Sequence, residues 1–203
     1  TVAQYEVRNG VNGFNKSLYR YKAAVYNTRG RGFQGFREIT VDDVANQGRS
    51  HSVFEQKFPY TGMLKQTTQY AKHSNTYCRV SQTSYSPERN ASHQNTHGSD
   101  LYNMYNSQIQ SKSYPLNTYG GCSNTVLSTQ TQNVTGIDAY GNVTHQNSSQ
   151  VDNIDGYGHT KNASSVSTYN INTSSWFVNR LDKTVKTLAK TTRSSSDPMA
   201  SVA

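Results

Sequence analysis

Two histidines four residues apart, His93 and His97, have a spacing that could serve metal binding. At that spacing two imidazole rings share one face of a helix and can bind one metal ion. The segment that carries them, residues 86–100, contains Pro and Gly and almost no apolar residue, which favours a solvated loop over a helix. We therefore expect loop histidines, and the sequence predicts neither a metal site nor a cofactor.

The two cysteines are the next candidates for chemistry. Cys78 follows His73 by five residues, but no third group or flanking motif completes a nucleophile and its base. The sequence Gly120-Gly121-Cys122-Ser123 is more typical of a turn than of a nucleophile elbow. No catalytic residue is predicted. Whether Cys78 and Cys122 form a disulfide is left open, because spacing alone does not show that they meet.

The stretch Asn27–Arg37, which reads NTRGRGFQGFR, combines glycine and arginine in a way that could bind phosphate. Gly30-Arg31-Gly32 partly matches a phosphate-binding loop, but such a loop leads into a helix, and here strand-like sequence follows. Three arginines of the stretch therefore fit a solvated rim better than a phosphate grip: Arg29, Arg31 and Arg37. No phosphate site is predicted.

The same stretch has a clearer structural meaning. Three of its glycines can adopt positive φ or let another backbone approach closely: Gly30, Gly32 and Gly35. Phe33 and Phe36 place large apolar side chains on either side of the last glycine. Strand-like sequence flanks the stretch at Leu18–Tyr26 and Arg37–Val41. We interpret it as a tight, aromatic-anchored junction between two strands.

Alternation with a period of two runs through much of the chain. In Leu18–Tyr26, tyrosine, alanine and valine alternate with basic residues, which is typical of a half-buried strand. Asn-Gly dipeptides at positions 9–10 and 12–13 predict hairpin turns. Phe58–Gly62 predicts another turn, because Pro59 fixes φ and Gly62 permits positive φ. Other expected strands are residues 50–58, 63–71, 76–85 and 101–113.

The composition predicts an all-β fold with a thin core. Ser, Thr, Asn and Gln account for 81 of the 203 residues, whereas Leu, Ile, Val and Phe account for only 34. The 15 tyrosines supply apolar area and, with threonine and valine, favour strands. The net charge of +8 could suit nucleic acid, but basic and acidic residues are interspersed, so nucleic acid is not a predicted partner. No apolar run approaches the roughly 18 residues of a membrane-spanning helix.

A short repeat lies in the second half of the chain. IDAYGNVT at Ile137–Thr144 recurs as IDGYGHT at Ile154–Thr160. The matched residues after each isoleucine are Asp138, Tyr140 and Gly141, then Asp155, Tyr157 and Gly158. Asp can open a turn by bonding to its own backbone and Gly can close it, so each copy predicts one hairpin turn with a tyrosine packed beside it.

The end of the chain permits two interpretations. In residues 176–192, Leu181, Val185 and Leu188 suit one face of a helix, whereas several threonines favour a strand. The pattern alone does not decide between them. We divide the chain into residues 1–68, 69–115 with the polar loop 86–100, 116–192, and a frayed tail at 193–203. The first residue is Thr1 rather than Met, which fits a processed protein or a fragment.

Three sequence blocks occur in an order that resembles a known family. GRGFQGF at residues 30–36 is followed by FPYTGML at 58–64 and by WFVNRLDKTVKT at 176–187, which begins at Trp176. With the repeat, these blocks resemble the start of the Rhs/YD-repeat region in SpvB-like and TcdB/TcaC-like toxin proteins. The resemblance runs from Leu18 to Thr192. One departure is isoleucine, rather than the family's tyrosine, before each repeat aspartate.

The resemblance implies an architecture and a function. In such proteins a long ribbon of antiparallel hairpins winds into a hollow shell that encloses a toxic C-terminal domain until delivery. This chain would be one wall segment, an open, curved antiparallel sheet of successive hairpins, with residues 176–192 as strand. Its partners would be the rest of the same shell, the enclosed toxin domain and possible toxin-complex subunits. The protein would be bacterial, and secreted or delivered at the cell surface.

Family members also suggest where catalysis does not reside. Some SpvB-like proteins carry an ADP-ribosyltransferase, which requires a paired Glu-x-Glu motif, and the glutamates here stand apart at positions 6, 38, 55 and 88. The self-cleavage segment that ends many Rhs shells requires paired aspartates, which Asp197-Pro198 does not supply. A non-enzymatic wall segment is therefore expected. The alternative is a Tyr/Asn-rich adhesin module that binds glycans, which a closed sandwich with an exposed tyrosine cluster would favour.

Overall fold

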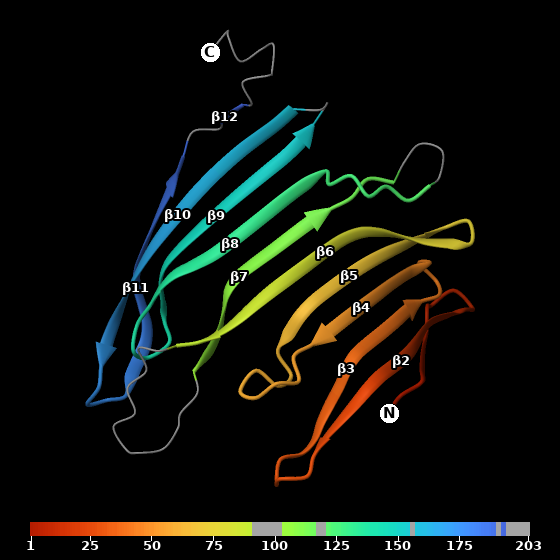
Figure 1. The fold of residues 1–203 in the computed structure, drawn as a ribbon, viewed down its shortest axis with the longest axis horizontal. Coiled ribbons are helices and arrows are strands. Elements are labelled where there is room, and N and C mark those ends of the chain that lie inside the picture. Colours follow the sequence, from red (N-terminus) through yellow and green to blue (C-terminus); the bar gives the residue numbers. More distant parts are fainter. Residues whose placement is uncertain (91–102, 117–120, 155–156, 190–191, 194–203) are drawn as a thin grey trace. The chain divides into compact units, whose positions relative to one another are not determined.

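The computed structural model describes residues 1–90, 103–116, 121–154, 157–189 and 192–193, and every regular element in them is a β-strand. Period-two alternation and the abundance of Tyr, Thr and Val explain why the chain forms strands. Figure 1 shows them as arrows. The strands are β1 Gln4–Arg8, β2 Phe14–Asn27, β3 Gly32–Asp43, β4 Gly48–Phe54, β5 Leu64–His73, β6 Thr76–Arg89, β7 Met104–Ser113, β8 Ser128–Ile137, β9 Val143–Ile154, β10 Tyr157–Asn172, β11 Phe177–Leu188 and β12 Thr192–Arg193.

The hydrogen-bonded order of the strands is their order in the chain, from β1 to β11, and β12 pairs with β10. Successive strands are antiparallel, as in β1–β2, β2–β3, β3–β4, β4–β5, β5–β6, β8–β9, β9–β10 and β10–β11. Within the described residues the first and last strands of this order do not pair with each other, so the sheet is open. The predicted class, an open antiparallel sheet of successive hairpins, is confirmed.

The chain forms two compact units. The first unit contains residues 1–84 and 111–126, and the second contains residues 85–110 and 127–203. The boundary crosses β6 and β7, so each of these strands contributes to both units. The units follow spatial proximity, whereas the four segments derived from the sequence follow composition. That division into segments stays a prediction.

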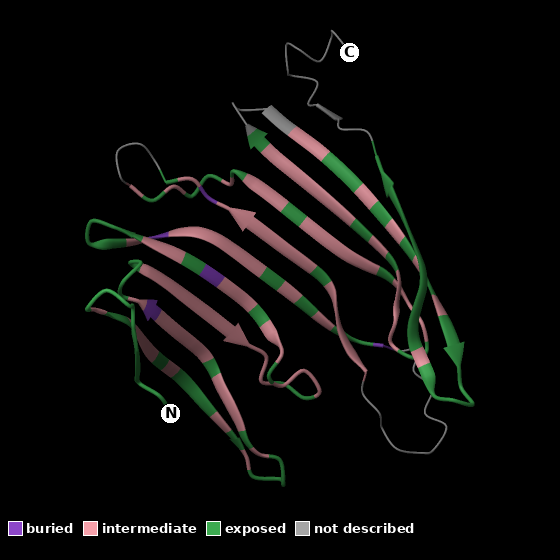
Figure 2. Cartoon of the chain, turned by 180° about the vertical axis from the view of Figure 1, so that it is seen from behind, coloured by how far each residue is buried: buried purple, intermediate pink, exposed green. Residues whose placement is uncertain are grey.

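Very few side chains of the described residues are fully buried. The buried apolar ones are Cys78 and Tyr114, and the buried polar ones are Asp42, Thr68 and Asn90. Figure 2 shows most strands in the intermediate and exposed colours. Both faces of a single-layer sheet meet water, so lateral contacts between neighbouring strands must supply the stability that a thick core supplies elsewhere. The thin core predicted from composition is confirmed.

Two expectations about elements are settled by the strand bounds. The segment from Phe177 to Leu188 is strand β11, as the family resemblance implied, and Val185 pairs with Val166 of β10. The expectation of a polar loop at residues 86–100 is wrong at its start, because Ser86–Arg89 continue β6. Polar cross-strand contacts hold this continuation, including Ser107 Oγ donating to the Ser86 carbonyl at 3.1 Å. His93 and His97 lie outside the described residues.

Candidate functional site

The glycine-rich stretch forms the turn end of the β2–β3 hairpin. Tyr26 and Phe33 are direct cross-strand partners there, and Asn27 pairs with Gly32. Gly30 and Gly32 have φ of 98° and 68°, in the region that glycine tolerates best. Phe33 contacts Phe36 edge-on, with ring centroids 5.4 Å apart. The junction predicted from the glycine and phenylalanine spacing is therefore a hairpin end anchored by aromatic rings.

A second predicted turn, which contains Pro59 and Gly62, joins this hairpin end. The loop between β4 and β5 is closed by backbone hydrogen bonds, among them Glu55 N to the Met63 carbonyl at 2.8 Å. Its Phe58 ring lies under the Arg31 guanidinium, 3.3 Å from Cζ to the ring centroid. We call Tyr26, Arg31, Phe33, Phe36 and Phe58 the aromatic junction. It unites two of the three sequence blocks that carried the family resemblance.

A charged cluster lies on one face of the first unit. Asp42 on β3 lies directly opposite Arg49 on β4, and Arg49 Nε donates to Asp42 Oδ1 at 2.6 Å. Arg20 on β2 reaches the other carboxylate oxygen, with Nη2 2.8 Å from Oδ2. The hydrogen bond from Arg49, together with the charges of Arg49 and Arg20, holds the pKa of Asp42 below its ordinary value although burial opposes this. The Arg49 guanidinium also lies 3.8 Å from the Tyr77 ring centroid.

Sequence reasoning missed this cluster, although part of the signal was present. A polar segment separates the two strands in the sequence, and a four-residue turn between Asp43 and Gly48 places Asp42 opposite Arg49. With one carboxylate between two guanidinium groups, the cluster ties three consecutive strands together.

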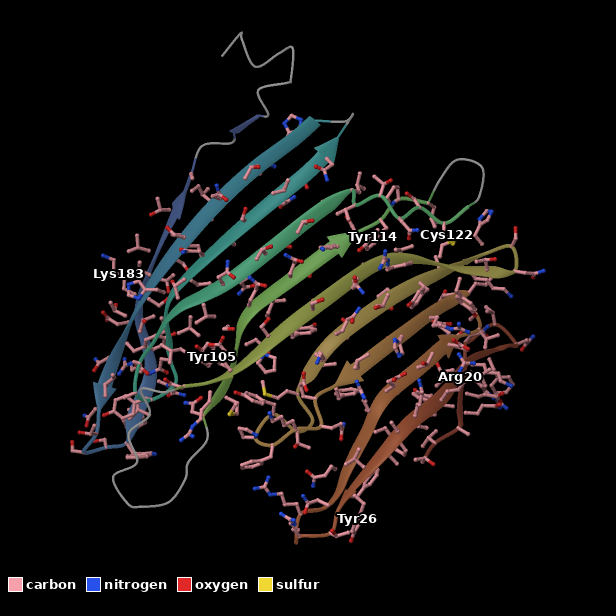
Figure 3. The ribbon with its side chains drawn as sticks, viewed as in Figure 1. Arg20, Tyr26, Tyr105, Tyr114, Cys122 and Lys183 are labelled. Carbon is pink, nitrogen blue, oxygen red and sulfur yellow. A yellow bond between two sulfur atoms is a disulfide. The ribbon has the colours of Figure 1, made fainter. Side chains whose placement is uncertain are left out.

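The two cysteines form a disulfide between Cys78 on β6 and Cys122. Cys122 follows β7 and forms an isolated antiparallel bridge with Leu116. Nearby, Tyr114 N donates to the Val80 carbonyl at 2.9 Å, and Arg79 lies over the Tyr114 ring with Cζ 3.9 Å from its centroid. Cys122 and Tyr114 are labelled in Figure 3. The disulfide removes Cys78 from consideration as a nucleophile.

The first copy of the repeat is an aspartate-closed turn between β8 and β9. Asp138 Oδ1 accepts hydrogen bonds from the backbone N of Tyr140 and of Asn142, each at 2.9 Å. Gly141 has φ of 89°, and its N donates to the Asp138 carbonyl at 3.1 Å. This is the turn chemistry predicted from the sequence. Tyr140, however, is 40% exposed, so it does not pack closely beside the turn.

Two further contacts bind this turn to other strands of the second unit. Asn90, at the end of β6, donates from Nδ2 to the Asp138 carbonyl at 2.9 Å. Asn142 donates from Nδ2 to Asp138 Oδ2 at 2.8 Å and to the Val178 carbonyl of β11 at 2.7 Å. The turn is thus a point where the ends of β6, β8, β9 and β11 meet.

The second copy of the repeat does not reproduce the first. β9 ends at Ile154 and β10 begins at Tyr157, and these two residues are partners. Tyr157 and Gly158 therefore belong to a strand, whereas Tyr140 and Gly141 lie in a turn. The two copies differ in sequence, because Gly156 stands in place of Ala139 and His159 follows Gly158 where Asn142 follows Gly141. The second copy thus also joins the two strands of a hairpin, but its Gly158 lies in β10 rather than in the turn, and Asp155 lies outside the described residues.

The third resemblance block begins at the turn between β10 and β11. Trp176 has φ of 56° and is 77% exposed. The side chain of Asn172 caps this turn, because its Oδ1 accepts from Ser175 N at 3.0 Å and from Ser174 Oγ at 2.7 Å. The turn therefore holds Trp176 at the surface of the second unit.

Within the described ranges, no group of three or more His, Cys, Asp or Glu residues is arranged to hold a metal ion. In the same residues, no helix is long and apolar enough to cross a membrane. The arginines of the junction, Arg29, Arg31 and Arg37, are exposed as expected. Several of the described residues singled out from sequence lie in turns or at hairpin ends, among them Gly30, Gly141 and Trp176.

Comparison with known proteins gives likeness at the level of structure. No protein-family model matches the chain, and no curated protein matches it. The solved structure "Crystal Structure of TcdB2-TccC3" is similar over 94% of this chain, with a TM-score of 0.71 and 11% identity. The structure of the same complex without its hypervariable C-terminal region has a TM-score of 0.67 over 91% of this chain, at 10% identity. The structure with Cdc42 has a TM-score of 0.64 over 92% of this chain, at 10% identity.

This likeness shows the fold. The chain spans 13%, 12% and 12% of the lengths of those three chains. The similarity covers nearly all of this chain. The TcdB-like resemblance inferred from three short blocks is confirmed for the fold.

Proposed function

We propose that this chain is a structural wall segment of an Rhs/YD-repeat shell, which encloses and helps to deliver a toxin domain and is itself not catalytic. The observation that carries the proposal is the likeness to TcdB2-TccC3 over 94% of the chain, together with an open sheet of successive hairpins. Its partners are the remainder of the same shell, the enclosed domain and toxin-complex subunits. The protein is secreted or delivered by a bacterium.

The side-chain contacts agree with the role of a wall segment. A sheet exposed to solvent on both faces must be stabilised along its own plane, since no second layer covers it. The Asp42 cluster joins three neighbouring strands in this way, and the disulfide joins β6 to the segment that follows β7. The Asn142 side chain ties the β8–β9 turn to β11. The adhesin alternative predicted a closed sandwich, and the open strand order does not favour it.

The first test is the sequence on both sides of this segment. The proposal expects several hundred residues of further Tyr-Asp/Gly repeats, followed by an unrelated C-terminal domain. A reading frame that encodes only this segment contradicts it, because so short a ribbon encloses nothing.

A second test uses the full-length protein with a specific protease site placed in the C-terminal domain. An enclosed domain is cleaved at least tenfold more slowly in the native protein than after denaturation. Equal cleavage rates in the two states contradict enclosure.

A further inference from the structure

The aromatic junction presents large apolar side chains to solvent at one place. Tyr26 and Phe33 are direct cross-strand partners, so their side chains project from the same face of the hairpin. They are 69% and 57% exposed, and Phe58 is 45% exposed. Figure 3 shows Tyr26 at the turn end of β2 and β3. Several large apolar side chains exposed at one hairpin end are typical of an interaction site.

The same hairpin end is rich in arginine. Arg29 and Arg31 lie in its turn and Arg37 lies further along β3, and all three are exposed. None of the three has an ion-pair partner among the described residues of the chain. Arg31 instead stacks on Phe58, where the aromatic face orients its guanidinium without neutralising the charge. Tyrosine, phenylalanine and arginine together are the residues enriched at binding hot spots.

The first unit has no carboxylate left over for these arginines. It contains five acidic residues, and each is engaged elsewhere: Glu6 with Lys16, Glu38 with Lys22 and His51, Asp42 with Arg20 and Arg49, Asp43 with Asn46, and Glu55 with Lys65. Carboxylates that neutralise the junction must therefore come from outside this unit. Charge complementarity then specifies an acidic partner.

The hairpin end is also held in place before any partner arrives. Gly30 and Gly32 have positive φ, and Gln34 Nε2 donates to the Arg31 carbonyl at 3.0 Å. Gln56 Nε2 donates to the Phe36 carbonyl at 3.3 Å, which joins the β4–β5 loop to the hairpin. A surface fixed in this way loses little conformational entropy when it binds.

We propose that the aromatic junction is a docking surface for an acidic polypeptide segment that also carries aromatic or aliphatic side chains. The carboxylates pair with the exposed arginines, and the apolar side chains cover Tyr26 and Phe33. A polypeptide fits better than single-stranded nucleic acid, because opposed rings on two strands make one apolar patch rather than a row of stacking platforms. The inference is independent of the shell function, since it rests on the first unit alone.

Selection from a random dodecapeptide display library on the oxidised 203-residue chain tests this inference. We expect the selected peptides to combine Asp or Glu with Trp, Phe, Tyr or Leu. Their affinity, measured by fluorescence anisotropy, falls at least tenfold for Arg31→Glu and for the double variant Tyr26→Ser/Phe33→Ser. The matched control Arg8→Glu removes an exposed cation elsewhere on the unit and changes affinity less than twofold.

Three results overturn the inference. The first is selection of peptides without acidic residues. The second is an equal loss of affinity for Arg8→Glu and Arg31→Glu, which shows general attraction to a basic protein. The third is tighter binding of dodecathymidylate than of every selected peptide, with the same dependence on Tyr26 and Phe33. Circular dichroism of each variant checks that the fold is retained. The variant Arg31→Lys keeps the charge but loses planar stacking, so we expect it to lose only part of the affinity for the peptides.

Discussion

The side-chain amide of Asn142 links two strands of the second unit, because its Nδ2 lies 2.8 Å from Asp138 Oδ2 and 2.7 Å from the Val178 carbonyl oxygen. The first contact closes the β8–β9 turn, and the second fastens that turn to β11. In a sheet with almost no apolar core, contacts of this kind carry a large part of the specificity of folding.

Replacing Asn142 by Ala should therefore destabilise the chain. Each lost hydrogen bond contributes about 1 kcal/mol, so we expect the free energy of unfolding to fall by about 2 kcal/mol. Urea unfolding followed by circular dichroism measures it. The control is Asn170→Ala on β10, whose side chain is exposed and makes no hydrogen bond within the described residues. If the two substitutions lowered the free energy of unfolding equally, the Asn142 amide would not stabilise the contact between the β8–β9 turn and β11.

Asp42 should make the stability depend on pH. Its folded-state pKa lies below the ordinary 3.8, so its stabilising contribution is complete above that value and is lost as the pH falls through the folded-state pKa. Asp42→Asn removes charge-assisted hydrogen bonds, and we expect a loss of about 2 kcal/mol at pH 7. The loss should shrink as the pH falls below about 4, because the wild-type carboxyl is then protonated.

The control for Asp42 is Asp182→Asn, which removes an exposed carboxylate of β11 that has no ion pair within the described residues. It should change the unfolding free energy by less than about 0.5 kcal/mol. An Asp42→Asn effect that stays constant between pH 7 and pH 2.5 would contradict the assigned role.

The disulfide should be a major source of stability. It joins residues 44 apart, and closing a loop of that length stabilises a folded chain by about 4 kcal/mol in the chain-entropy description. The double variant Cys78→Ala/Cys122→Ala should lower the urea midpoint accordingly, and reduction of the wild type should give a similar shift. A change below about 1 kcal/mol in both experiments would show that neighbouring strand contacts alone hold this region.

At Gly35 the effect of backbone conformation on stability can be measured apart from the effect of side-chain packing. It lies inside β3 with φ of 89°, yet a methyl group there would meet no atom within 4 Å. Gly35→Ala should therefore cost about 1–2 kcal/mol through the backbone alone. Gly48→Ala is the matched control, because Gly48 lacks positive φ and its added methyl would make only ordinary contacts, the nearest at 3.9 Å. Equal urea midpoints for the two variants would contradict this assignment.

Local chemistry was predictable where a turn depends on neighbouring residues. Glycine and phenylalanine spacing predicted the junction at Gly30–Phe36, and Asp138 with Gly141 predicted the β8–β9 turn. In both cases the deciding contacts are hydrogen bonds or backbone angles within a few residues. The identity of β11 required the family resemblance, because Leu181, Val185 and Leu188 fit a helical period whereas the threonines of the same segment favour a strand.

Contacts that depend on register were not predictable. The contact between Arg20 and Asp42 depends on how β2 pairs with β3. The register of this pairing shifts between Ala24 and Tyr26. Ala23 has φ of 54°, and alanine gives no signal for such a conformation. The meeting of Cys78 and Cys122 depends on the path of β6 and β7. In the repeat, Tyr157 and Gly158 lie in β10 whereas Tyr140 and Gly141 lie in a turn, although the two copies match at these positions.

The most direct measurement of the proposed function is a cryo-electron microscopy structure of the full-length protein that contains this segment. We expect residues 1–193 to form consecutive antiparallel strands in the wall of a hollow shell, with density for a further domain inside it. A map in which this segment forms a separate closed domain, with no enclosed volume around a C-terminal region, would contradict the proposal.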